Sequence, residues 1–413
     1  MYNTLVRYSP LVDGLDQKAH EIASIGLVAN IKEVTYPTLS ARICTTRAVL
    51  VFNLLQSIKN RRRDDHFGSI LVLCWNSLFT GDPNYTEQIA SNDRFYCQVM
   101  LRMAYFCFQR LDDIKLSQLP AKTFHPAISG LFDTMVIKTF SKLINMAKSG
   151  KLVSGEMDLV IALLQQILAI NEVDIIMSQF VSIVNQSDCM RACLSLFSWS
   201  AKLIVEEEPL YGELALLFLL EISIIPDLAE QMAIHGIIDS FLESKVSEEL
   251  QQGGVTSMDN PCLHRIWAKG MLPLVINLFM HLDTRFANQT KTFLKIFWPQ
   301  IQFALDSWAQ PKVVTLASVQ ETAVIITLMT AMEQHPNVNL EGLTYDKDAL
   351  VENINYVTLH QKYLASLIIP ITNDDKKLQS EKVEASNQLN QTIVEKLREI
   401  VNIVVDPFGE ADN

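Results

Sequence analysis

Residues 213–243 read ELALLFLLEISIIPDLAEQMAIHGIIDSFLE. The apolar residues recur at spacings of three and four, which is the period of an α-helix. The pattern predicts a long helix to Ser223, a break at Pro226 and a short helix to Ile234. Gly236 then opens a third apolar run, and glycine permits a sharp turn at that point. This stretch therefore predicts three successive helices joined by tight turns.

Armadillo repeats have this order of helices, with a glycine between the short second helix and the long third helix. A second stretch is similar, because Gly270 opens GMLPLVINL after a short helix that is expected to end at Lys269. Elsewhere the spacing is looser, as in HEAT repeats. Such repeats stack, because one helix pair cannot bury its apolar face alone.

The helical period extends along most of the chain, as in the run Leu159, Leu163, Ile167 and Ile170. Strict alternation of apolar and polar residues is nearly absent. A single compact core stops growing near ~250–300 residues, and this chain has 413. We therefore predict an all-α, elongated α-solenoid of ARM/HEAT-like repeats. A compact helical bundle is the alternative.

No low-complexity linker divides the chain, so one continuous ARM/HEAT-like solenoid is predicted for residues 1–373. Long loops are expected at residues 247–260, which contain a Gly-Gly pair, and at residues 334–345. Residues 374–405 are predicted to form one capping helix, which ends before Pro407. One face of its second half carries five aliphatic residues, namely Leu389, Ile393, Leu397, Ile400 and Val404.

The two ends of the chain differ in this prediction. Residues 406–413 are expected to be a disordered tail. No polar capping helix opens the chain at its N-terminus. We therefore expect the sequence to be a piece of a longer protein.

The charge of the chain limits its partners. The formal net charge is -12 and the pI is about 5.2. Nucleic-acid binding needs a basic stripe that neutralises phosphates, so no nucleic acid is expected. The richest apolar run, residues 214–228, is interrupted by Glu221, Pro226 and Asp227, whereas a spanning helix needs ~20 apolar residues. Direct membrane insertion is therefore not expected, and the acid excess favours basic partners.

The sequence contains none of the familiar catalytic or phosphate-binding motifs, so we predict no catalytic residue, no metal, no cofactor and no enzyme activity. Seven cysteines, an odd number, favour a reducing compartment. Cys189 and Cys193 share a helix face among apolar neighbours, which favours a core pair over a zinc site. His264 and His281 are expected to bond helix-end carbonyls.

Two charge clusters have simple interpretations. Lys59, Arg61, Arg62 and Arg63 form the basic run of the chain. Cations suit a helix C-terminus, and this interpretation is preferred to a targeting signal or a phosphate contact. The acidic residues 206–208 lie at a predicted helix junction and are expected to be solvated.

Aromatic residues are dense between positions 286 and 308. Five residues approximate one buried helical stripe, namely Phe286, Phe293, Phe297, Ile301 and Trp308. Trp298 and Phe303 point away from that stripe, and Pro299 is expected to kink the helix. These two off-stripe aromatics either pack on neighbouring helices or form a groove for a partner's apolar residues. They are the candidate partner-binding residues.

Residues 266–278, IWAKGMLPLVINL, resemble the C-terminal region of a large scaffold nucleoporin, the one-eighty-eight class of the nuclear pore inner ring. The unit at residues 213–243 and the stretch at residues 292–308 are similar to that family as well. The resemblance is best from about residue 210 to residue 308.

The resemblance implies a long α-helical superhelix in the nuclear pore complex at the nuclear envelope. It implies a C-terminal tail that docks a short helical segment of a linker nucleoporin, the Nic-ninety-six class, and that supports nucleocytoplasmic transport. It also implies weak binding of phenylalanine–glycine repeat nucleoporins. No residue-level partner motif is carried over.

Two other hypotheses remain open. A karyopherin-like transport receptor or another HEAT/ARM adaptor would bind a small GTPase and cargo. A helical enzyme with an unrecognised site would show a buried cluster of ionisable groups in one cleft.

Overall fold

The computed structural model describes residues 46, 48–53, 56, 94–109, 128–170, 173–335, 340–383 and 386–406. Within these ranges the chain is helical apart from turns, loops, isolated bridges and one two-stranded hairpin. It divides into two compact units, Met1–Cys189 and Met190–Asn413. The basic run at residues 59–63 lies outside the described residues.

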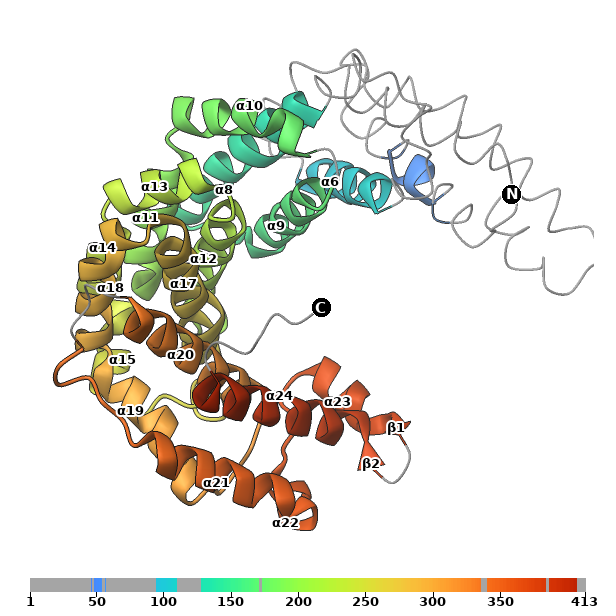
Figure 1. The fold of residues 1–413 in the computed structure, drawn as a ribbon. Coiled ribbons are helices and arrows are strands. Elements are labelled where there is room, and N and C mark those ends of the chain that lie inside the picture. The colour runs from blue at the N-terminus through green and yellow to red at the C-terminus, as the bar shows by residue number, and fades with distance from the viewer. Residues whose placement is uncertain are drawn as a thin grey trace, which may run out of the picture. The chain divides into compact units, whose positions relative to one another are not determined.

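The first unit is a small stack of helices (Figure 1). Its described elements are α6 (Arg94–Phe108), the π-helix η4 (Phe132–Lys138), α8 (Thr139–Lys148), α9 (Ser154–Leu168) and α10 (Val173–Gln186). Helix α9 packs against α6 and η4, and α10 packs against η4. The rings of Phe132 and Phe180 stack with centroids 4.1 Å apart, which joins η4 to α10 in the core.

The second unit is longer. In chain order its elements are α11 (Cys189–Trp199, which begins at the last residue of the first unit), η5 (Ser200–Lys202), α12 (Leu210–Ile222), α13 (Pro226–Ile234), α14 (Ile237–Glu243), η6 (Lys245–Ser247), α15 (Glu248–Gln252), α16 (Pro261–Arg265), η7 (Ile266–Met271), α17 (Leu272–Leu282), α18 (Thr284–Ile296), α19 (Trp298–Asp306), η8 (Ser307–Ala309), α20 (Leu316–Gln334), α21 (Lys347–Leu359), α22 (Gln361–Leu367), α23 (Asn373–Ser380), β1 (Lys382–Val383), β2 (Ser386–Asn387) and α24 (Gln388–Val405).

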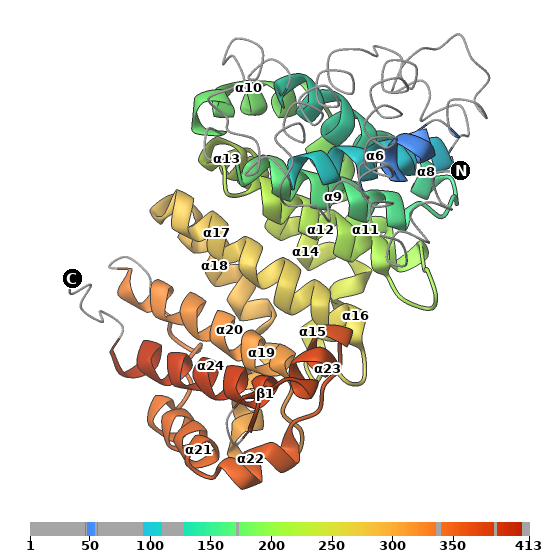
Figure 2. The ribbon, with the colours of Figure 1, turned by 90° about the vertical axis from the view of Figure 1, so that its right-hand side faces the viewer.

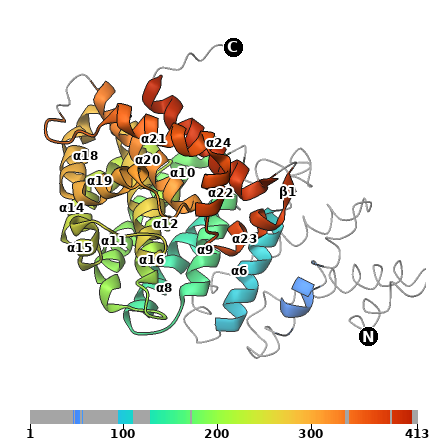
Figure 3. The same cartoon turned by 90° about the horizontal axis from the view of Figure 1, so that it is seen from below.

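The helices of the second unit stack in a row, as in a solenoid. Helices α12 and α13 pack on α17, α17 packs on α20, α20 packs on α24 and α24 packs on α21 (Figure 2). A second layer runs beside this row, where α14 contacts α18 and α15 contacts α19 (Figure 3). Each helix buries its apolar face against its neighbours in the stack, which is how repeat arrays are stabilised.

The three-helix pattern predicted for residues 213–243 is confirmed. Helix α12 ends at Ile222 with Ser223 as its C-cap, and Pro226 is the first residue of α13. Proline suits that position because the first N–H groups of a helix have no partner within the helix. Gly236 has a φ of 72° and precedes α14. Glycine adopts this left-handed conformation without the steric cost that a Cβ atom brings.

The turn predicted at Gly270 is wrong. Gly270 lies inside η7, a π-helix that joins α16 to α17 without a break. A Cβ atom at this position would lie 2.9 Å from Leu216 Cδ1 and 3.0 Å from Leu216 Cβ. The glycine therefore permits η7 to approach α12 closely, and it does not turn the chain.

The single capping helix predicted for residues 374–405 is also wrong. Helix α23 ends at Ser380, and the β1–β2 hairpin pairs Lys382 with Asn387 before α24 begins. Helix α24 lies between α20 and α21 and does not close the stack (Figure 2). Its predicted apolar face is buried at four positions, Leu389, Ile393, Leu397 and Ile400, while Val404 is half-buried.

The predicted end of α24 is confirmed, because the helix stops at Val405 with Asp406 as its C-cap. The rest of the predicted disordered tail, residues 407–413, lies outside the described residues.

The loop predicted at residues 247–260 packs against the start of α19. It contains α15, and Gly253 has a φ of 80°. A Cβ atom on Gly253 would lie 2.7 Å from the carbonyl oxygen of Pro299. The Gln300 side chain accepts a hydrogen bond from Val255 N–H and donates one to Val255 C=O, each at 2.9 Å. These contacts join the loop to the start of α19. In the second predicted loop, residues 336–339 lie outside the described part.

Candidate functional site

A buried polar cluster surrounds Glu321 on α20. Its Oε1 accepts hydrogen bonds from Trp267 Nε1 at 2.8 Å and from Gln300 Nε2 at 3.0 Å. Its Oε2 lies 2.8 Å from His264 Nε2. His264 was expected to bond a helix-end carbonyl, and its ring instead pairs with this carboxylate.

This cluster holds helices together. Its members lie on α16, η7, α19 and α20, and the side chains of Glu321, His264, Trp267 and Gln300 are all buried. A catalytic acid or base needs to reach a substrate within hydrogen-bond distance. A folded core requires its buried polar groups to have hydrogen-bond partners, and these four side chains supply partners for one another. The cluster therefore supports the packing of these helices.

The described cysteines belong to the core. Cys189 and Cys193 are fully buried, as predicted for a core pair. Burial raises the pKa of Cys107 to about 12. Burial also raises the pKa of Cys262 to about 12, with a further contribution from the nearby Glu213 carboxylate. Among the described residues, no three His, Cys, Asp or Glu side chains gather in a way that could hold a metal ion.

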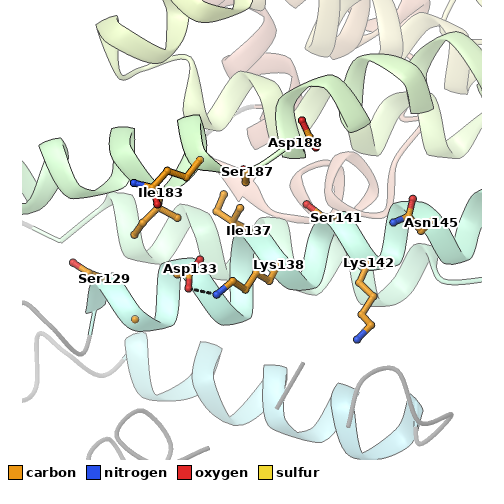
Figure 4. Close-up of a pocket in the computed structure, with 12 residues that line it drawn as sticks. Ser129, Asp133, Ile137, Lys138, Ser141, Lys142, Asn145, Ile183, Ser187 and Asp188 are labelled. Atoms are coloured by element: carbon orange, nitrogen blue, oxygen red, sulfur yellow. Dashed lines mark hydrogen bonds and ion pairs between the residues drawn. The ribbon is translucent and has the colours of Figure 1, made fainter. Parts of the chain in front are cut away.

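A polar cavity of about 750 Å³ lies in the first unit, between the η4–α8 helix and the end of α10 (Figure 4). Lys138 Nζ donates to Asp133 Oδ2 at 2.5 Å on one wall, and Lys142 lies one turn further along. Ser187 and Asp188 line the opposite side. Charges of both signs therefore face this space, and neither sign dominates.

The aromatic stripe predicted in the second unit is confirmed as core. Phe286, Phe293, Phe297 and Ile301 are fully buried, and Trp308 is nearly so. Phe293 stacks on the Trp267 ring with centroids 5.7 Å apart. The stripe thus contributes packing area and leaves no groove of its own.

The two predicted partner-binding residues lie outside the stripe. Trp298 is half-buried and is the first residue of α19. Phe303 is 41% exposed. Pro299 occupies the second position of α19, so it begins a new helix instead of kinking one continuous helix. Phe303 therefore stays a candidate contact for a partner. Trp298 could contact a partner only through the part of its side chain that is exposed.

A larger exposed apolar surface, which the sequence reasoning missed, lies on α21 and α22. Tyr356 and Tyr363 are exposed with ring centroids 6.4 Å apart, and Leu359 between them is 80% exposed. The imidazole of His360 lies against Tyr356, with centroids 4.3 Å apart. We call Tyr356, Leu359 and Tyr363 the α21–α22 patch.

Neighbouring backbone extends this patch. Val314 N–H donates to Leu367 C=O at 2.9 Å, and Ile369 N–H donates to Val314 C=O at 3.0 Å. The exposed side chains of Val313 and Ile369 therefore come close to α22. Lys312 and Lys362 are exposed beside this apolar, aromatic surface, and Glu352 is exposed one turn before Tyr356 on α21.

The spacing of the patch explains why it was missed. Tyr356, Leu359 and Tyr363 recur at three and four, as core residues do. The helix breaks at His360, and the residues that α21 buries are Leu350, Ile354, Val357 and Thr358. An apolar pattern alone cannot tell which face of a helix meets its neighbour.

Together, the row of stacked helices, the bonded core and the exposed apolar faces define an all-α solenoid. Residues 70–404 match the protein family described as nuclear pore protein NUP188 C-terminal domain. The match covers most of the chain, and the chain belongs to this family.

Individual relatives agree with this assignment. The chain is 31% identical over 303 residues to nucleoporin nup184 of Schizosaccharomyces pombe, which covers 70% of this chain and 19% of that protein. It is 27% identical over 216 residues to nucleoporin NUP188 of Saccharomyces cerevisiae, which covers 48% of this chain and 13% of that protein. The chain thus spans about a fifth or less of these relatives' length.

A solved structure shares the fold. Nup188(aa1445–1827) from Myceliophthora thermophila superposes with a TM-score of 0.61 at 21% identity, covering 86% of this chain and 98% of that chain. The predicted family, the all-α solenoid class and the nuclear pore localisation are thereby confirmed. A karyopherin-like receptor is not favoured. No described helix is both long and apolar enough to span a bilayer.

Proposed function

We propose that this chain is a structural scaffold of the nuclear pore inner ring and not an enzyme. Its α21–α22 patch docks an amphipathic helical segment of a linker nucleoporin of the Nic-ninety-six class. Membership of the NUP188 C-terminal domain family supports the scaffold role. The exposure of the α21–α22 patch is the observation that supports this surface as the docking site.

The chemistry of the patch fits a helix. An amphipathic helix lays its apolar face into an apolar surface through residues spaced at three and four. Tyrosine gives a large contact area at a small entropic cost, because only two side-chain torsions become fixed. Lys312 and Lys362 at the margin favour a segment with acidic residues beside its apolar face. Such a scaffold supports nucleocytoplasmic transport by holding other pore proteins in place. We propose in addition that Phe303 contacts phenylalanine–glycine repeats weakly.

Calorimetric titration of the chain with a synthetic helical segment of the linker nucleoporin tests the proposal. The Y356A/L359A variant removes two exposed side chains and should weaken binding at least about tenfold, since burying one large aliphatic side chain contributes ~1.5–3 kcal/mol. The control variant I234A/M280A removes two side chains that are each 67% exposed elsewhere in the unit. It should bind as the unmodified chain does.

Two outcomes would contradict the proposal. Failure of the segment to bind at micromolar concentration would refute linker docking by this chain. Binding that survives Y356A/L359A but is lost in F303A or W298A would move the docking site to α19.

A further inference from the structure

A second exposed apolar surface lies at the end of α11. Trp199 is the last residue of α11, and Ile204 follows five residues later; each side chain is 50% exposed. Lys202 Nζ lies 5.3 Å from the centroid of the Trp199 ring. The exposed indole therefore already holds a cation over its face, supplied by the chain itself.

A tight acidic turn follows this tryptophan. Val205 and Glu208 exchange two backbone hydrogen bonds of 2.9 Å, and Glu206 and Glu207 form the turn between them. Both glutamates are exposed. Only eight residues lie between Trp199 and Glu208, so the ring and the turn are neighbours along the chain. We call Trp199, Lys202, Ile204, Glu206 and Glu207 the Trp199 surface.

The charges of this turn divide into two groups. Arg265 contacts Glu208 at 3.4 Å and Glu213 at 2.8 Å, which balances part of the local negative charge. Within the described part of the chain, Glu206 and Glu207 make no ion pair. The Trp199 surface therefore presents two uncompensated carboxylates beside an aromatic ring and an aliphatic side chain.

We propose that the Trp199 surface binds a basic segment of another protein, in which an arginine stands next to an aliphatic residue. An arginine is attracted to an indole face, and Lys202 already places a cation over the Trp199 ring, so the incoming arginine takes the place of Lys202 there. Ile204 receives the aliphatic residue. Glu206 and Glu207 attract the remaining cations and speed the encounter. Nucleic acids and anionic membranes are repelled by the same carboxylates.

This surface is separate from the α21–α22 patch, and its partner has the opposite charge. The patch carries lysines at its margin and favours acidic flanks, whereas the Trp199 surface favours basic ones. A negative result for linker docking therefore does not affect the partner proposed for the Trp199 surface.

Fluorescence anisotropy with the labelled peptide RLRKLRR tests the inference at low and at moderate salt. The E206Q/E207Q variant keeps the size of both side chains and should weaken binding about fivefold to tenfold. The W199A variant should weaken it similarly. The K202A variant removes the competing cation and should strengthen binding about twofold to threefold.

The control variant D348N/E352Q removes two exposed carboxylates on α21, so it changes the net charge equally at another place. It should bind the peptide as the unmodified chain does. A second variant, E206N/E207G, tests whether the glutamates serve folding. Both positions have positive φ, 50° and 70°, which asparagine and glycine adopt more readily than glutamate. This variant should raise the melting temperature while it weakens peptide binding.

The outcomes separate the alternatives. Absence of binding to the unmodified chain, or equal weakening in D348N/E352Q, would overturn the inference. If a peptide with serine in place of leucine bound equally well, net charge alone would explain the binding. That result would also overturn the inference. Preferential binding of anionic vesicles or of RNA would assign the surface to another class of partner.

Discussion

Replacement of Glu321 by alanine removes the acceptor that three buried groups share. Trp267 Nε1 and Gln300 Nε2 would lose their hydrogen bonds to Oε1, and His264 Nε2 would lose its partner Oε2. A buried donor that is left without a partner costs ~1–3 kcal/mol. The free energy of unfolding of the second unit should therefore fall by about 3–5 kcal/mol.

The E321Q variant separates the shape of the side chain from its charge. Glutamine keeps one oxygen for Trp267 and Gln300, and its amide N–H can donate to His264 Nε2 in the tautomer that carries its proton on Nδ1. The loss should then be about 1 kcal/mol, because each of the three buried groups keeps a hydrogen-bond partner.

Thermal and urea unfolding of the purified chain, followed by circular dichroism, measures both variants. A change of 1 kcal/mol shifts the melting temperature of a unit of this size by roughly 2–4 °C, so E321A should melt roughly 6–20 °C lower. The exposed Glu243 provides the control, and E243A should change stability by less than ~0.5 kcal/mol. An E321A variant as stable as the unmodified chain, or a glutamine as costly as the alanine, would refute the proposed role of the cluster.

Three further predictions follow from single residues. The G236A variant should lose about 1 kcal/mol in thermal unfolding, because its φ of 72° suits glycine, while G155A, with no atom within 4 Å of its added Cβ, should lose nothing. The G270A variant should lose ~1–3 kcal/mol through overlap with Leu216, and adding L216A should cost less than the sum of the two single changes. Cys107 should resist alkylation at pH 8 in the folded chain, as followed by mass spectrometry, because a pKa of about 12 leaves about one thiol in ten thousand ionised; rapid labelling before unfolding would contradict this.

Local signals were sufficient for the repeat at residues 213–243. Helical spacing, a proline at the start of α13 and a glycine with positive φ each act within a few residues of the chain. The aromatic stripe was predictable for the same reason. Contact between water and five bulky apolar side chains on one helix face is unfavourable, so such a face is expected to be buried.

Gly270 shows where local reasoning fails. The need for glycine there arises from Leu216, which lies far away in the sequence and approaches only after η7 packs on α12. A turn glycine and a close-contact glycine look the same in the sequence. Only tertiary packing separates the two roles.

The hairpin inside residues 374–405 was missed for a different reason. The polar stretch before α24 is rich in residues that favour helices, so a continuous helix was the expected choice. Asn387 was an available signal, because its side chain accepts a hydrogen bond from Asn390 N–H at 2.9 Å and begins α24 as an N-cap. The docking surfaces were harder to predict, since exposure depends on which face of each helix meets its neighbour.

The position of α24 between α20 and α21 affects how this end of the molecule loses and gains structure. In a simple linear array the last repeat frays first and alone, because it contacts one neighbour. Here α21 packs both on η8, which precedes it, and on α24, which is synthesised after it, so its packing is incomplete while the chain is still emerging. Removal of α24 would expose the facing sides of α20 and α21 at once, so α20, α21 and α24 should melt as one cooperative block.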